Sequence, residues 1–338
     1  MRLTRWFLVR VTLSIFILFV ASGPLYAASF SFAVLGDSQG DSHHDINVPV
    51  LSGLVSDVLE TNAGFVFCTG DLVYGEFGTF LTATLAEQLT HWRDIMAPIY
   101  NANFYGAKVY AGPGNHEIKD AGSETVWQSV FGDLPANGPA GETYMTYSFD
   151  FLNAHFIMLD TERAGSPHTV NQTWLAADLA ATEAKHIFVF GHEPAFPVGL
   201  HAGSSLNAFP DERDAFWNLL VQYHVDIYFC GHEHLYDHQE VDGVQQVIAG
   251  SAGAPYQAYG GDFYNYVLVT VDGAKVSVEI IDDQQTLRDH FEFARPVPLP
   301  AVAWLLGVGV LCLAGGRLIF PKRRYPPANI SLIAPEGR

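Results

Sequence analysis

The sequence predicts an α/β layered sandwich built as one domain. Short apolar runs alternate several times with helical patterns, which is typical of sheets covered by helices. No internal repeat, charge block or low-complexity linker interrupts residues 29–295, so we expect a single domain there. In addition, five apolar runs lead directly into a glycine turn that carries a metal-competent side chain. We therefore expect strand ends that together build a functional site.

The first half of the chain predicts alternating strands and helices. In order, we expect a strand over 30–35, a helix over 48–60, a strand over 65–69, a helix over 80–96 and a strand over 108–111. Pro49 favours the start of the first helix. The second helix is indicated by Leu81, Leu85, Leu89 and Trp92, which recur at helical spacing.

The second half predicts a hairpin, two further helices and a series of strands. In order, we expect a hairpin of 144–149 and 155–159, a helix over 172–184, a strand over 186–190, a helix over 211–223 and a strand over 226–230. The remainder, to Phe293, alternates as antiparallel strands do, with turns at Asp242-Gly243 and Asp272-Gly273.

Composition excludes several classes of protein. The 338 residues include 17 Lys and Arg but 36 Asp and Glu, a formal charge of −19 at pH 7. Such a charge repels a nucleic-acid duplex, so we expect no nucleic-acid partner. With 49% hydrophobic residues, the chain can fill a core and is no disordered tail. Three cysteines are too few for a disulfide framework, and we expect Cys68 and Cys230 to be buried free thiols.

Residues 1–28 have the pattern of a secretory signal peptide. Three arginines precede the apolar run 11–20, and small residues follow around Ala27. This run is shorter than the ~20 residues that span a bilayer, which favours cleavage over an uncleaved anchor. We therefore expect export to the periplasm, the outer envelope or the extracellular space.

Residues 296–338 contain a second apolar segment. Positions 297–316 carry no charge, are long enough to span a bilayer and precede a basic cluster at 317–324. The Val-Pro-Leu-Pro sequence at Val297 resembles the PEP-CTERM sorting signal that exosortase-type enzymes process after export. The resemblance implies membrane attachment until cleavage and an exosortase-like enzyme as a partner. A plain C-terminal anchor is the alternative.

Removal of both ends would make the charge more uneven. Eight of the 17 basic residues lie outside 29–295, but only Glu336 among the acidic ones does. Nine basic and 35 acidic residues would remain. This field disfavours anionic polymers as substrates unless bound cations create a local positive centre.

The five glycine turns carry the residues suited to chemistry. They are Gly36-Asp37, Gly70-Asp71, Gly114-Asn115-His116-Glu117, Gly191-His192 and Gly231-His232-Glu233-His234. Glycine permits a tight turn and brings the next side chain to the carboxyl edge of a sheet, where α/β folds bind ligands. One such turn is ordinary in a loop or helix cap. Five together predict converging carboxylates, an amide and imidazoles, a donor set that suits Zn, Mn or Fe.

These motifs, in this order, resemble the calcineurin-like metallophosphoesterase family over nearly all of the exported domain. The resemblance implies a four-layer αββα sandwich of two mixed sheets with flanking helices and a dinuclear metal site at the strand carboxyl edge. It also implies a metal-dependent phosphoric ester hydrolase with two ions of Fe, Mn or Zn. The ligands it implies are Asp37, Asp71 and His234 for the first ion and Asp71, Asn115, His192 and His232 for the second.

The resemblance also implies catalytic roles. Two ions about 3.5–4 Å apart, bridged by Asp71, would hold the attacking hydroxide and neutralise the phosphoryl oxygens. His116 would lie beside the leaving-group oxygen and donate a proton, and Asn115 would contact the substrate as well as a metal. Separately, His201 in the Gly/Ser/Pro-rich stretch 197–210 could reach over the site as a substrate contact. The alternative for His201 is a solvated loop histidine.

One position departs from the family pattern. Gln39 stands where an Asp-X-His motif is common, which leaves the first ion one imidazole short. Gly70-Asp71-Leu72-Val73-Tyr74 resembles the Gly-Asp-X-X-Tyr motif of purple acid phosphatases, and this makes Tyr74 a candidate fifth ligand. A core or rim tyrosine is the alternative, and His43 or His44 could fill the same gap.

We therefore expect an exported phosphoesterase that acts on small phosphorylated substrates, with phosphomonoesters ahead of diesters. A phosphodiesterase or nucleotidase is one alternative. A catalytically silent binding or surface-layer module on the same fold is another. A third is a membrane-tethered protein whose metals only stabilise the fold.

Overall fold

The computed structural model describes residues 29–76, 80–102, 108–119, 121–256 and 263–295. The predicted signal peptide, 1–28, and the predicted C-terminal sorting or anchoring segment, 296–338, lie outside these residues. Within the described ranges, no helix has both the length and the apolarity to cross a membrane.

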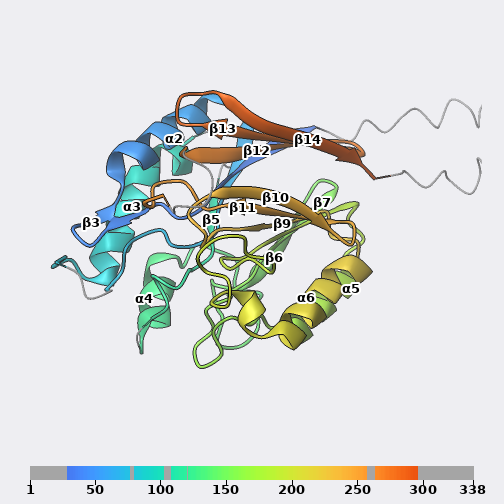
Figure 1. The fold of residues 1–338 in the computed structure, drawn as a ribbon, viewed down its shortest axis with the longest axis horizontal. Coiled ribbons are helices and arrows are strands. Elements are labelled where there is room, and N and C mark those ends of the chain that lie inside the picture. Colours follow the sequence, from blue (N-terminus) through green and yellow to red (C-terminus); the bar gives the residue numbers. More distant parts are fainter. Residues whose placement is uncertain (1–28, 77–79, 103–107, 120, 257–262, 296–338) are drawn as a thin grey trace, which may run out of the picture. The chain divides into compact units, whose positions relative to one another are not determined.

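Two six-stranded mixed sheets lie at the centre of the fold (Figure 1). The strands of the first sheet, in spatial order, are β14 (Leu287–Ala294), β13 (Lys275–Asp282), β12 (Asn265–Asp272), β1 (Phe30–Leu35), β4 (Ala63–Cys68) and β5 (Lys108–Ala111). Those of the second sheet are β10 (Tyr236–Val241), β11 (Val244–Ala249), β9 (Ile227–Cys230), β8 (His186–Phe190), β7 (Ala154–Met158) and β6 (Tyr147–Phe151). A small hairpin of β2 (Gln39–Asp41) and β3 (His44–Ile46) follows β1.

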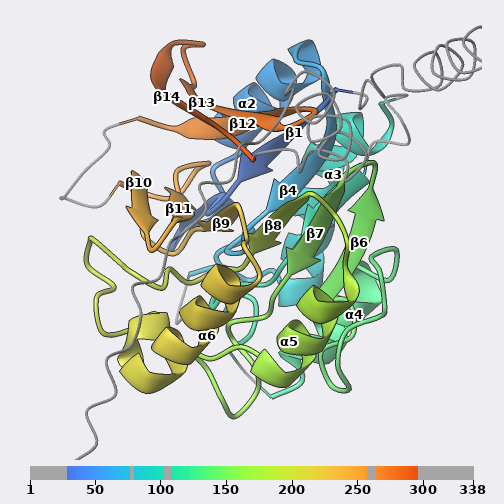
Figure 2. The ribbon, with the colours of Figure 1, turned by 90° about the vertical axis from the view of Figure 1, so that its right-hand side faces the viewer.

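Helices cover the outer face of each sheet. They are α2 (Val48–Glu60), α3 (Leu85–Tyr100), α4 (Ser123–Val130), α5 (Gln172–Ala181) and α6 (Pro210–Gln222), with a short 3₁₀ turn at Leu206–Ala208. Leu54 of α2 and Trp92 of α3 belong to a core cluster that includes the first sheet and extends to residues of the second. Leu175 of α5 and Phe216 of α6 belong to a separate cluster with the second sheet, on the side that Figure 2 shows. The predicted four-layer αββα sandwich is confirmed.

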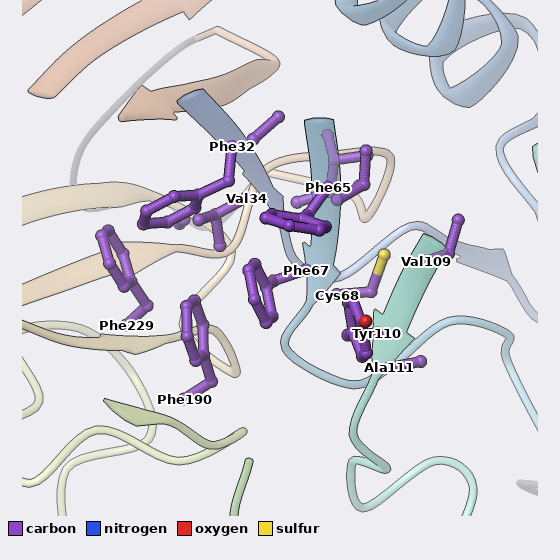
Figure 3. Close-up of a cluster of buried hydrophobic side chains, with 14 of the residues drawn as sticks. Phe32, Val34, Phe65, Phe67, Cys68, Val109, Tyr110, Ala111, Phe190 and Phe229 are labelled. Atoms are coloured by element: carbon purple, nitrogen blue, oxygen red, sulfur yellow. The ribbon is translucent and has the colours of Figure 1, made fainter. Parts of the chain in front are cut away.

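Phenylalanine rings fill the space between the two sheets. Alternation along a strand points Phe32 of β1 and Phe67 of β4 toward the second sheet, and both side chains are buried (Figure 3). Phe67 stacks on Phe190 of β8 with ring centroids 4.0 Å apart. Phe32 meets Phe188 edge-on at 5.1 Å. These contacts fix how the sheets face each other and hence where their ends meet.

The parallel strands determine where the site forms. β1, β4 and β5 run parallel in the first sheet, and β7, β8 and β9 run parallel in the second. The five predicted glycine turns follow β1, β4, β5, β8 and β9. Their side chains therefore collect at the carboxyl ends of the strands.

Several elements differ from the sequence-based expectation: β6 is Tyr147–Phe151 rather than 144–149, α5 ends at Ala181 rather than at 184, and the β2–β3 hairpin and α4 were not among the predicted elements. The helix predicted over 80–96 begins at Leu85, because Thr84 and Glu87 form a reciprocal capping box there. Phe80, the predicted first residue, is 77% exposed. The strand predicted over 65–69 already begins at Ala63, and β11 pairs in parallel with β9 as well as antiparallel with β10. Cys68 and Cys230 are buried free thiols, as expected.

Candidate metal centre

Two groups of potential ligand atoms share the carboxylate of Asp71. One group contains Asp37, Asp71 and His234, and the other contains Asp71, His192 and His232; the atoms within each group lie within 4.8 Å of one another. Asn115 joins the second group, because its Oδ1 lies 3.0 Å from His192 Nε2. The structure thus brings together every residue predicted as a ligand from the family resemblance other than Tyr74.

Strained turns hold these side chains in place. Asp37, Asp71 and His232 have φ values of 57°, 49° and 68°, a left-handed conformation that is uncommon for residues with a Cβ. Gly70 has φ 95°, and a Cβ at this position would lie 2.7 Å from His192 Nδ1. A Cβ on Gly231 would collide with Asp37 Oδ2. Such strain is retained mainly where function requires the geometry.

Backbone carbonyls fix the orientation of the three imidazoles. Each ring donates one N–H to a backbone carbonyl oxygen 2.9 Å away: His192 to that of Thr69, His232 to that of Ser204 and His234 to that of Pro255. In the neutral ring, the other nitrogen then presents a lone pair to the centre. His192 Nε2 and His232 Nδ1 lie only 3.1 Å apart. Two lone pairs at this distance need a positive charge between them, so the residues fit a bound cation.

The pKa values of the two central carboxylates are shifted in opposite directions, because burial raises each pKa and the nearby imidazoles lower it. Burial alone would raise the pKa of Asp71, but the imidazoles of His192 and His116 outweigh it and hold this pKa well below its usual value. For Asp37, burial dominates and raises the pKa well above its usual value, although His192 opposes it. A divalent ion between the two groups would stabilise both as anions.

Burial keeps the imidazoles of His232 and His234 neutral, because it disfavours their charged form. Burial lowers the pKa of His232 well below its usual value, and that of His234 to about 4. Neutral imidazole is the form that binds metals. Burial also lowers the pKa of His192, but Asp71 outweighs it and raises this pKa overall.

His116 lies at the edge of the cluster. Its Nδ1 donates to the carbonyl of Tyr74 at 2.7 Å, and its Nε2 lies 3.8 Å from Asp71 Oδ2. The Tyr74 ring lies beside the His116 ring, with centroids 5.2 Å apart. The ring of His201 lies 4.1 Å from that of His232. The structure thus places Tyr74 and His201 next to members of the cluster.

Gln39 occupies the space beside the first group. Its Nε2 lies 3.1 Å from Asp71 Oδ2 and 3.2 Å from His234 Nε2, whereas its buried Oε1 has no partner among the described residues. Rotation of the amide by half a turn would present an oxygen donor to the same space. His43 and His44 are exposed and lie outside both ligand groups; His44 bonds to Asp41 at 2.9 Å.

Two glutamates organise the site without joining either ligand group. The carboxylate of Glu117 accepts the backbone N–H groups of Asp71, Val73 and Gly114 at 2.9–3.0 Å. Burial and the nearby Asp71 raise the pKa of Glu117 to about 8. Glu233 accepts the N–H of His201 at 3.2 Å and holds the loop that carries this histidine. Both glutamates lie inside the recognised motifs, but the motifs alone gave them no role.

Comparison of the sequence with known protein families identifies a match to one family. The profile described as calcineurin-like phosphoesterase matches residues 30–236. Over 129 residues, 37% of this chain and 28% of the relative, the chain is 30% identical to purple acid phosphatase 23 of Arabidopsis thaliana. Over 233 residues, 62% of this chain and 42% of the relative, it is 23% identical to phosphoenolpyruvate phosphatase of Allium cepa. The chain thus spans less than half the length of these curated relatives.

Solved structures show the same fold. The structure titled GAP50, the anchor in the inner membrane complex of Plasmodium, gives a TM-score of 0.57 with 16% identity, covering 84% of this chain and 95% of that one. PhoD gives a TM-score of 0.58 with 14% identity, covering 80% and 71%. At these identities the likeness concerns the fold alone.

A buried carboxyl group close to the centre predicts a pH dependence of stability. Asp160, the second residue after β7, accepts the N–H of Glu162 at 2.8 Å, and burial raises its pKa to about 8. The folded state therefore binds this proton more tightly than the unfolded state, so its contribution to stability is lost as pH rises from about 4 to about 8. Asp160→Asn keeps the acceptor oxygen and removes the titration.

We expect the stability of Asp160→Asn relative to wild type to increase steadily between pH 5 and pH 8. Urea unfolding of chelator-treated protein at several pH values measures this difference. Asp94→Asn, at an exposed position of α3, is the control and should show a flat difference. A flat difference for Asp160→Asn would contradict the interpretation.

Proposed function

The chain belongs to the calcineurin-like phosphoesterase family, and we propose that it hydrolyses phosphate esters, phosphomonoesters in preference to diesters, at the cluster around Asp71. The observation that carries the proposal is the pair of ligand groups sharing one buried carboxylate. A shared carboxylate is the arrangement that holds two metal ions close together. The donor set of carboxylates, imidazoles and an amide suits Fe, Mn or Zn.

Each residue of the cluster has a proposed task. Asp37 and His234 would hold one ion, Asn115, His192 and His232 would hold the other, and Asp71 would touch both. When bound, such a pair supplies Lewis-acid charge for the phosphoryl oxygens and lowers the pKa of water in an in-line displacement. The carbonyl contacts of the imidazoles keep these side chains oriented whether or not substrate is present.

His116 is proposed to protonate the leaving group. Its Nδ1–H is taken by the carbonyl of Tyr74, which leaves Nε2 as the nitrogen that would carry the proton for transfer. Nε2 lies near Asp71, and therefore near the place where the phosphoryl group would be held. His201, over the His232 ring, would contact the substrate.

The relatives support an enzyme of the monoesterase type. Their printed names are purple acid phosphatase and phosphoenolpyruvate phosphatase, and both name hydrolases of phosphate esters. The GAP50 structure is titled an anchor, so the fold by itself does not decide between an enzyme and a structural protein. The assembled ligand groups and the position of His116 favour the enzyme, because an anchor does not require a proton donor.

Release of p-nitrophenol from p-nitrophenyl phosphate and from its bis-ester tests the proposal directly. We expect turnover of the monoester by metal-loaded protein and slower turnover of the bis-ester. Asp71→Asn should abolish turnover and release metal, because it removes the shared ligand. Metal-loaded protein that hydrolyses neither ester would refute the proposed function.

A second measurement isolates His116. His116→Ala should keep its metal but lose ~10²–10⁴-fold in turnover of esters with poor leaving groups. The loss should be much smaller for p-nitrophenyl phosphate, because p-nitrophenolate departs almost without protonation. Steady-state kinetics on an alkyl phosphate and on p-nitrophenyl phosphate compares the two, and equal losses would remove His116 from the acid role.

Tyr74 is proposed as a further ligand of a ferric ion in the first site. Support comes from its Gly-Asp-X-X-Tyr context, from its position beside His116 and from the similarity to purple acid phosphatases. Charge transfer from the phenolate should colour iron-loaded protein violet, and Tyr74→Phe should remove the colour. Active protein that contains two Mn or Zn and remains colourless when iron is available would contradict this role.

Export is proposed from the two ends of the sequence. We expect mature protein that lacks residues 1–28 and either lacks the segment from Val297 or is held in a membrane by it. Intact-mass measurement on protein from the native envelope decides between these forms. A cytoplasmic product that retains Met1 would contradict export.

A further inference from the structure

A third group of potential metal-ligating side chains lies next to His192 in the fold. Glu162 follows β7, Glu193 directly follows His192, and His168 comes from the loop between them; one ligand atom of each lies within 4.8 Å of the others. Glu162 and Glu193 are 5% and 0% exposed. The His168 side chain is 28% exposed. This group shares no residue with the two groups around Asp71.

The chain folds back on itself to bring His168 to the two glutamates. The backbone N–H of His168 donates to the carbonyl of Thr161 at 2.9 Å, and Glu162 and Thr169 form an isolated parallel bridge. His168 Nδ1 then lies 2.5 Å from Glu193 Oε1. The imidazole is therefore held against the carboxylate rather than directed into solvent.

The two glutamates leave buried oxygens without a donor. No N–H or hydroxyl group of the described residues bonds to Glu162 Oε1 or to Glu193 Oε2. Arg163, the neighbouring cation, is engaged by Glu142 at 2.9 Å. Burial raises the pKa of Glu162, and the adjacent Glu193 carboxylate raises it further. Two buried carboxylates in contact are stable only if a proton or a cation lies between them.

We propose that Glu162, His168 and Glu193 bind a third metal ion, a divalent transition cation such as Mn²⁺ or Zn²⁺. One imidazole nitrogen and two carboxylates form a mixed donor set of the kind these ions prefer. Ca²⁺ usually takes six to eight oxygen ligands, which is more than these side chains supply. Of the three side chains, Glu162 also lines a neighbouring pocket of about 330 Å³, together with Gly165 and Pro167.

This site goes beyond the proposed hydrolysis, which needs only the two ions around Asp71. An ion here would tie the loop 162–169 to the turn after β8 that carries His192. Its role is therefore to support the position of His192, and none of its three ligands takes part in the reaction.

The test counts metal ions with the Asp71 sites removed. Asp71→Asn protein is stripped with a chelator, incubated with excess Mn²⁺ or Zn²⁺, passed through a desalting column and analysed for metal per chain. We expect about one ion in Asp71→Asn and none in the double variant Asp71→Asn/His168→Gln. Far-UV circular dichroism checks that each variant is folded, and Glu162→Gln replaces His168→Gln if that variant does not fold.

His155→Gln in the Asp71→Asn background is the matched control. His155 also lies between two carboxylates, but both of its ring nitrogens are hydrogen-bonded, to Asp150 at 2.6 Å and to Asp178 at 2.8 Å. This control should keep its ion. Equal metal content in Asp71→Asn and Asp71→Asn/His168→Gln, including none in either, would overturn the proposal and indicate a shared proton. Loss of the ion in both the His168 and the His155 variants would overturn it as well.

Failure of the proposed function would look different. A protein that hydrolyses no ester but loses one ion on His168→Gln would retain the third site without the phosphoesterase. If the protein hydrolyses phosphate esters but its metal content does not change on His168→Gln, the proposed function stands and the third site is refuted.

Discussion

The structure depends on keeping the carboxylate of Asp71 charged at a buried position. Asp71 is 1% exposed, and an unpaired charge at such a position costs several kcal/mol. Its Oδ1 accepts the backbone N–H of His116 at 3.0 Å, and its Oδ2 accepts the amide of Gln39 at 3.1 Å. The carboxylate of Glu117 accepts a hydrogen bond from the backbone N–H of the same aspartate. Asp37, Asp71 and His232 adopt left-handed backbone conformations in the turns around this carboxylate.

The core packing and the site both require the same relative position of the two sheets. The stacked rings of Phe67 and Phe190 fix the sheets in the middle. At the carboxyl edge, the carboxylate of Asp37, after β1, accepts the N–H of His232, after β9, at 2.9 and 3.0 Å. This bond joins residues 195 apart in the sequence. A shift of one sheet against the other would therefore disrupt the core packing and the ligand geometry together.

The sequence was sufficient to predict most of the strands and the glycine turns at their ends, because glycine turns after apolar runs are local features. It could not identify the carbonyls of Thr69, Ser204 and Pro255, which orient the imidazoles, since every residue has such a group. The sequence also did not single out Glu162 and Glu193. Their carboxylate oxygens come together, buried and without hydrogen-bond donors, only when β7 and β8 are paired. The start of α3 was misplaced for a local reason, since the capping box at Thr84 was overlooked in favour of the apolar spacing.

Charge explains why metal and substrate binding should be inseparable in this protein. The chain carries a formal charge of −19, and the side chains around Asp71 are carboxylates, amides and imidazoles. Such a field repels a phosphate dianion approaching from solvent. The same carboxylates, however, attract divalent cations, and a loaded centre would reverse the sign of the local potential. The acidic residues of the centre would therefore allow the protein to bind an anionic substrate, but only in its metal-loaded form.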